Sequence, residues 1–344
     1  PADVTSLSNN LVMAVYADPQ NVVWAGTRGG GLNRIDLLTG KTTRYLHNTR
    51  DASSLIDDNI AVIIPDGGTG LWLGTYGGLS HYDTVANTFT NYANNSTNNM
   101  SLSENRIVSL YLDESRNVLW IGTWGGGLNR FDLKDPLHKI PNFATFKRYR
   151  YSSNDPTSLS EDSVWSIQGN ADGSLWLGTQ SGLNHFDPET QTFQRYTEKQ
   201  GLPNESILGI LKDNEGYLWL TTNNGLVKFD PRAGEFTAYD VTDGLQGNEF
   251  NSNAYFRSRD GILYIGGTNG FNGFRPGDIL PNAVPPQVAI TKFEVFNEPL
   301  VLDLSGKTPI HLSYKQDFVT FEFAALDFRA PQKNRYAYML EGFD

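Results

Sequence analysis

The sequence contains no cysteine among its 344 residues, so disulfide bonds, thiolate metal sites and a cysteine nucleophile are excluded. It also contains no run of 18 apolar residues, which a membrane-spanning helix would need. Apolar residues nowhere recur with the 3.6-residue period of an amphipathic helix over a useful length. We therefore expect a chain with little helix and no membrane span of its own.

Basic residues are also few relative to acidic ones. The chain has 27 Lys and Arg against 38 Asp and Glu, which gives a net charge of −11. Nucleic acids and anionic membrane surfaces bind clustered positive charge. The composition therefore argues against both as partners.

Glycine and hydrophobic residues are well represented. The 34 glycines are spread along the chain and indicate many turns, while 39% hydrophobic residues predict a packed globular protein. The length suits roughly two domains. The chain opens at Pro1 with no Met and no signal peptide, so we expect a piece of a longer protein or a processed form.

A segment with an aromatic residue followed by a glycine-rich turn recurs six times. The clearest copy is LWIGTWGGGLNRFD, from Leu119 to Asp132. The recurring aromatic residues are Trp24, Trp72, Trp120, Trp176, Trp219 and Tyr264. Their spacings of 48, 48, 56, 43 and 45 residues are those of a propeller blade rather than of a helical repeat.

Each copy contains four short strand-forming segments separated by turns. Four such strands make one antiparallel propeller blade, which buries both faces only by stacking on neighbouring blades. In the third copy Leu119 and Ile121 should point to one side of the strand, and Trp120 and Gly122 to the other. We expect the repeated tryptophan to pack against the neighbouring blade. No helix follows the glycine-rich turn, so a phosphate-binding reading of the glycines is not supported.

Regular repetition stops near Pro276. Residues 280–286 lie in a proline-rich linker, and residues 287–344 show strands with partial alternation. These 58 residues predict the first part of an immunoglobulin-like β-sandwich, which needs about 100 residues in all. The predicted fold class is therefore all-β, with a β-propeller of four-stranded blades over 1–279 and a truncated sandwich over 287–344.

The repeats resemble those of the two-component regulator propeller family, in which LWxGTxxGGLxxFD follows a strand that ends in Asp. The segment 243–279 resembles the degenerate last repeat of that family. The tail, with ITKFEVFN, FEFAALDF and NRYAYMLEGFD, resembles the Y_Y_Y sandwich domain that follows such propellers. Tyr336 and Tyr338 occupy its tyrosine-bearing strand.

The resemblance implies an extracytoplasmic sensor on the periplasmic side of a bacterial inner membrane, in a hybrid histidine kinase or a related signalling protein. It implies a small polar ligand, often derived from a glycan, and signalling through a homodimer. Membrane contact would come only through segments outside this chain. Propellers of this family usually hold about seven blades. Six repeats are therefore compatible both with a six-bladed ring and with a seven-bladed ring that lacks one blade.

Candidate contact residues lie in the turn between the second and third strands of each copy. Scaffold positions repeat, whereas the residue after GT varies, and in a propeller this turn opens on the ligand-binding face together with the segments that join blades. Aromatic rings stack on sugars, and amides bond to hydroxyls. The candidates are Arg28, Tyr76, Trp124, Gln180, Asn223 and Asn269, with Arg106 from a blade-joining segment. Alternatively, the residue after GT varies only because turns tolerate substitution.

No catalytic motif is evident, and we expect neither a catalytic residue, a metal nor a cofactor in this chain. His81 and His185 occupy a third-strand position that is Arg or Lys in other copies, which indicates an ordinary partly exposed site. Acidic turns such as DNEG are more simply strand turns than Ca²⁺ sites. A propeller enzyme resembling a streptogramin lyase, and a structural interaction module, remain as alternatives to the sensor.

Overall fold

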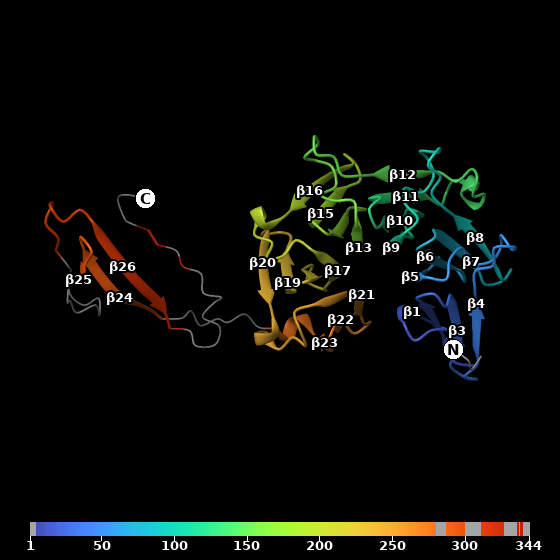
Figure 1. Cartoon of the computed structure of the whole chain (residues 1–344), viewed down its shortest axis with the longest axis horizontal. Helices are drawn as coiled ribbons and strands as arrows, with labels where there is room; N and C mark the ends of the chain where they lie inside the picture. Colours follow the sequence, from blue (N-terminus) through green and yellow to red (C-terminus); the bar gives the residue numbers. More distant parts are fainter. Residues whose placement is uncertain (1–4, 280–286, 300–310, 327–335, 337, 340–344) are drawn as a thin grey trace. The chain divides into compact units, whose positions relative to one another are not determined.

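The computed structural model describes residues 5–279, 287–299, 311–326, 336, 338 and 339. The chain divides into two compact units, Pro1–Pro276 and Gly277–Asp344. The first unit consists of five four-stranded antiparallel sheets and one three-stranded sheet, with the strands of each sheet in sequence order (Figure 1). The predicted all-β propeller is confirmed, and the sixth copy has three strands among the described residues.

Each sheet is one blade, and blades are numbered in chain order. Blade one contains β1 (Val12–Asp18), β2 (Val22–Thr27), β3 (Leu32–Asp36) and β4 (Thr42–Tyr45). Blade two contains β5 (Ile60–Pro65), β6 (Leu71–Thr75), β7 (Leu79–Asp83) and β8 (Thr88–Tyr92). Blade three contains β9 (Ile107–Asp113), β10 (Val118–Thr123), β11 (Leu128–Asp132) and β12 (Phe146–Tyr149).

The remaining blades follow the same plan. Blade four contains β13 (Val164–Gly169), β14 (Leu175–Thr179), β15 (Gly182–Asp187) and β16 (Thr192–Tyr196). Blade five contains β17 (Ile207–Lys212), β18 (Leu218–Thr222), β19 (Gly225–Asp230) and β20 (Glu235–Tyr239). Blade six contains β21 (Phe250–Arg257), β22 (Leu263–Gly267) and β23 (Gly270–Phe274). The first strands of successive blades are neighbours, from β1 and β5 to β17 and β21, so they surround the propeller axis (Figure 1).

Helix is confined to short 3₁₀ turns in the described part of the chain. These are η1 (Pro136–Lys139), η2 (Glu198–Gln200), η3 (Val241–Asp243) and η4 (Pro276–Asp278). The first of them lies in the long connection between β11 and β12, which accounts for the wider spacing between Trp120 and Trp176. None of the described helices is long and apolar enough to cross a bilayer.

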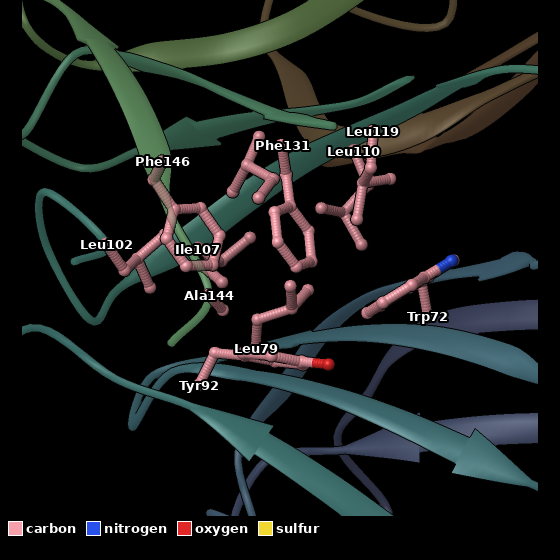
Figure 2. Close-up of a cluster of buried hydrophobic side chains, with 11 residues drawn as sticks. Trp72, Leu79, Tyr92, Leu102, Ile107, Leu110, Leu119, Phe131, Ala144 and Phe146 are labelled. Carbon is pink, nitrogen blue, oxygen red and sulfur yellow. The ribbon is translucent and has the colours of Figure 1, made fainter. Parts of the chain in front are cut away.

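The repeated tryptophans lie between blades, as the alternation pattern predicts. Trp72 of blade two meets Phe131 of blade three edge to face, with ring centroids 6.0 Å apart. Figure 2 shows this cluster, in which side chains of blades two and three point toward one another. Trp120 of blade three in turn meets Phe186 of blade four at 5.3 Å. In blades one to five, the tryptophan of the repeat therefore packs against an aromatic ring of the next blade.

In blades one to four, the glycine two residues after the tryptophan allows the next blade to approach closely, whereas blade five has Thr221 there. A Cβ atom on Gly122 would lie 2.5 Å from the carbonyl oxygen of Val164 in the first strand of blade four. The Ser109 hydroxyl donates a hydrogen bond to the same oxygen at 2.8 Å. Glycine is needed here for lack of space, because no side chain fits between the two strands.

The segments that join blades are held by buried asparagines and by arginines. Asn129 of β11, fully buried, accepts a hydrogen bond from the Ser103 amide and donates one to the Ser103 hydroxyl. Arg148 of β12 donates to the carbonyl oxygens of Asn98, Ser101 and Leu102. Asn184 and Arg195 repeat these contacts in blade four. These polar residues are scaffold, although their type alone would suggest a binding site.

The second unit contains one three-stranded antiparallel sheet among its described residues. Its order is β25 (Glu298–Pro299), β24 (Val288–Val295) and β26 (Val319–Ala325). The Tyr336 hydroxyl accepts a hydrogen bond from the Ala325 amide at 2.9 Å. The predicted linker 280–286 and most of the predicted sandwich beyond Leu326 lie outside the described residues. The described residues form a single sheet, and the sandwich stays a prediction.

Candidate ligand-binding face

One end of the propeller is formed by the turns between second and third strands and by the blade-joining segments; we call it the loop face. The backbone links the two sets of segments. The amides of Gly125 and Gly127 in the blade-three turn donate to the carbonyl oxygen of Asp162, which leads into blade four. The amide of Trp124 donates to the carbonyl oxygen of Arg106, just before β9. The predicted turn and blade-joining residues therefore share one face.

Trp124 is the centre of an aromatic and cationic cluster on this face. Its side chain is 45% exposed, whereas the repeated Trp120 is 4% exposed. The guanidinium carbon of the exposed Arg106 lies 5.2 Å from the centroid of the Trp124 ring. Trp165 belongs to β13 of blade four, and its ring centroid lies 5.3 Å from the ring centroid of Trp124. The cluster thus spans two blades and presents a large apolar surface beside a positive charge.

The loop-face arginines have no acidic partner among the described residues. The guanidinium groups of Arg28 and Arg106 form no hydrogen bond or ion pair with any of those residues. Both side chains are exposed. In a chain of net charge −11, unpaired cations on one face are available to a carboxylate, a phosphate or a sugar hydroxyl.

The other predicted residues are on the same face but do not join the Trp124 cluster. Tyr76 is half-buried, and its amide donates to the carbonyl oxygen of Asn59. Gln180 is exposed. Asn223 donates to the hydroxyl of Ser206, and Asn269 bonds to Gln246, so both amides are partly used within the protein. Within the described part of the chain, no set of contacts brings all six turn residues together.

Trp165 is absent from the residues predicted from the sequence. It occupies the site of a register shift in β13, between Val164 and Ser166. In blades one, two, three and five, the residue at the equivalent register shift is Met13, Ala61, Val108 and Leu208, respectively. A comparison of these equivalent positions would have identified Trp165, because every other member is a smaller, non-aromatic residue. Its buried Nε1 has no acceptor among the described residues.

The propeller axis is bridged by a side chain of the degenerate sixth blade. The register of β21 shifts by several residues between Phe250 and Tyr255, and Asn253 adopts a φ of 60° there. Its side-chain amide donates to the carbonyl oxygens of Ala61 at 2.9 Å and Val108 at 3.1 Å. Blade six is therefore linked by hydrogen bonds to blades two and three across the axis.

The two third-strand histidines pack on the repeated tryptophans. The His81 ring lies 4.3 Å from that of Trp72, and its Nε2 lies 2.9 Å from a carboxylate oxygen of Asp66. The His185 ring stacks on Trp176 at 4.2 Å. In other blades Arg34 and Lys228 cover Trp24 and Trp219 in the same way. The position is a structural one. Elsewhere in the described residues, no group of three or more His, Asp or Glu side chains could hold a metal.

His185 gives the fold a pH dependence. Burial lowers the pKa of His185, and the nearby carboxylates of Asp172 and Asp187 oppose this only in part. The unfolded chain therefore takes up a proton that the folded chain excludes, and stability falls as the pH drops below about 6.5. We expect His185→Gln to reduce this loss in urea unfolding between about pH 5.5 and 8. Equal loss in both proteins would contradict the assignment.

Comparison with known proteins matches two segments of the chain to a family model. The model of the family described as "Two component regulator propeller" matches residues 6–29 and 201–224. "Histidine kinase P4" of Formosa agariphila is 32% identical over 111 residues, which are 30% of this chain and 8% of that protein. The chain therefore spans a small part of this curated relative.

Solved structures share the fold. A protein of B. thetaiotaomicron, described as the extracellular domain of a hybrid two-component system, superposes with a TM-score of 0.62 at 24% identity. The match covers 96% of this chain and 48% of that one. Virginiamycin B lyase of Staphylococcus aureus superposes with a TM-score of 0.53 at 13% identity, over 78% of this chain and 86% of the lyase. At these identities the likeness establishes the propeller fold alone.

Proposed function

Since this chain carries repeats of the two-component regulator propeller family, we propose that it is the ligand-binding part of an extracytoplasmic sensor. The matched histidine kinase and the extracellular domain of the B. thetaiotaomicron system support a sensor on the outer side of a membrane. Signalling through a homodimer belongs to the same proposal. A sensor transmits only the difference in ligand affinity between its states. The ligand site therefore determines what the protein reports.

The observation that carries the ligand proposal is the cluster of Arg106, Trp124 and Trp165. An exposed indole ring offers an apolar surface to the C–H face of a sugar, and an adjacent guanidinium bonds to its oxygens. The cluster lies on the loop face, where propellers commonly bind ligands. The proposed ligand is a small polar molecule of the kind released from glycans.

A thermal-shift screen of oligosaccharides tests this proposal. We expect at least one oligosaccharide to raise the unfolding temperature of the wild-type protein, since a ligand bound only to the folded state stabilises it. Trp124→Ala should abolish or strongly reduce the shift. Phe143→Ala removes another exposed aromatic side chain, one outside the loop-face turns, and should leave the shift intact. No stabilisation by any oligosaccharide, or an equal shift in Trp124→Ala, would overturn the sugar assignment.

A further inference from the structure

We propose that the cleft between blades four and five is a second binding site, which takes a neutral sugar residue. The cleft is a cavity of about 480 Å³, a size typical of small-molecule sites. Its lining comes from the turns between first and second strands and between third and fourth strands, including Ser174, Gly216 and Pro231. In antiparallel blades these turns are at the end opposite to the loop face. The site is therefore separate from the Trp124 cluster.

The floor of the cleft is aromatic. Trp176 and Tyr196 line it, with ring centroids 5.7 Å apart, and His185 lies stacked on Trp176. Trp176 itself is 5% exposed beneath the stacked imidazole. The half-buried rings of His185 and Tyr196 therefore provide the surface that the C–H groups of a sugar would meet.

Polar groups without protein partners surround this floor. The side chains of Gln194 and Glu215 are exposed and form no hydrogen bond with any described residue, and the imidazole of His185 forms none either. Lys212 donates to Oδ1 of Asn170 at 2.8 Å, a contact that joins the two blades and leaves two of its protons available. Oδ1 of Asp172 accepts from Ser174. One cavity therefore contains both donors and acceptors.

The balance of charge in the lining favours a neutral ligand. The lining contains two carboxylates, Asp172 and Glu215, and two cations, Lys212 and Arg232, of which Arg232 is already paired with Asp230 at 3.0 Å. An anionic ligand would meet two carboxylates, and a cationic ligand would meet two cations. A sugar hydroxyl both donates and accepts, so a ring with several hydroxyls can use both kinds of group.

The cleft between blades three and four provides an internal comparison. Its cavity is smaller, about 270 Å³, and is lined by Arg116, Arg130 and Lys147. All three cations are bound within the protein, Arg116 to Asp113 at 3.1 Å, Arg130 to Asp132 at 3.3 Å, and Lys147 to Gln191. Unpaired groups are therefore not a general property of clefts between blades. They distinguish the cleft of blades four and five.

The proposal is tested by titrating the whole ¹⁵N-labelled chain with single sugars and monitoring the indole N–H signals by NMR. The probes are glucose, galactose, mannose, fucose and xylose, each up to about 50 mM because single-sugar contacts bind at millimolar strength. We expect a saturable shift of the Trp176 signal with at least one of them. Gln194→Ala and Glu215→Gln should each weaken that binding by about fivefold through loss of a hydrogen bond. Gln20→Ala removes an exposed amide from a turn of blade one, outside both sites, and should have no effect.

The results that would overturn this second site differ from those that test the loop face. A Trp176 signal unmoved by every neutral sugar would overturn it, as would unchanged affinity in both Gln194→Ala and Glu215→Gln. Tighter binding of glucuronate or glucosamine than of any neutral sugar would overturn the assignment to a neutral ligand. Trp124→Ala should leave the Trp176 response unchanged, whatever it does to binding at the loop face.

Discussion

Replacement of Trp219 by alanine is expected to lower the free energy of unfolding of the propeller by about 3–5 kcal/mol, the usual cost of removing a large buried ring. Trp219 is 0% exposed and meets Phe274 of blade six with ring centroids 5.0 Å apart. Its Nε1 donates to Oδ2 of the buried Asp213 at 2.9 Å. Alanine would leave a cavity between blades five and six and a buried carboxylate without its donor. Urea unfolding measures the loss.

Trp124→Ala is the control for this prediction. It removes the same side chain type from an exposed position, so we expect a loss of no more than about 1 kcal/mol. The difference between the two losses in free energy of unfolding distinguishes the buried tryptophan of the repeat from the exposed tryptophan of the turn. Equal losses in the two variants would contradict the assignment of Trp219 to the core and of Trp124 to the surface.

Gly122→Ala is expected to lower the free energy of unfolding by about 3 kcal/mol, the upper part of the range for an overpacked core. The new Cβ would lie 2.1 Å from the Ser109 hydroxyl and 2.5 Å from the Val164 carbonyl oxygen. One neighbour is backbone of the next blade, so the clash is relieved only if blades three and four separate. Urea unfolding again gives the magnitude.

Gly277→Ala provides the matched glycine substitution. A Cβ on Gly277 would meet no atom of the described residues within 4 Å, and its φ lies outside the region that favours glycine. We expect a change within about 0.5 kcal/mol. A similar small change in Gly122→Ala would show that the blades pack less closely than described here.

The fold was predictable because its main determinant repeats. Trp120 and Gly122 face blade four together because side chains alternate along β10, and alternation is visible in the sequence. The four strand-forming segments of each of the first five copies were visible in the same way, and each of these copies forms a four-stranded blade. The position of the Asn253 side chain across the axis could not be predicted from the sequence. The register shift that places it there lies in β21, in the copy that departs most from the repeat.

The sites were only partly predictable. Trp124 stood out because it breaks the repeat, and Arg106 because it precedes a first strand. Trp165 approaches Trp124 only through the stacking of blades three and four. His185 and Lys212 lie 27 residues apart in the sequence and meet across a cleft whose shape depends on how two blades pack. Contacts between blades follow from three-dimensional packing, and no local pattern encodes them.

The central proposal is that the repeated tryptophans are scaffold, whereas side chains that vary on the loop face contact the ligand. The most direct test is thermal unfolding of the alanine variants at positions 28, 76, 124, 180, 223 and 269, each with and without the stabilising oligosaccharide. Without ligand, we predict unfolding temperatures within about 3 °C of the wild type. With ligand, the stabilisation should fall most in Trp124→Ala. Large losses of stability without ligand, or equal ligand stabilisation in all variants, would contradict the claim.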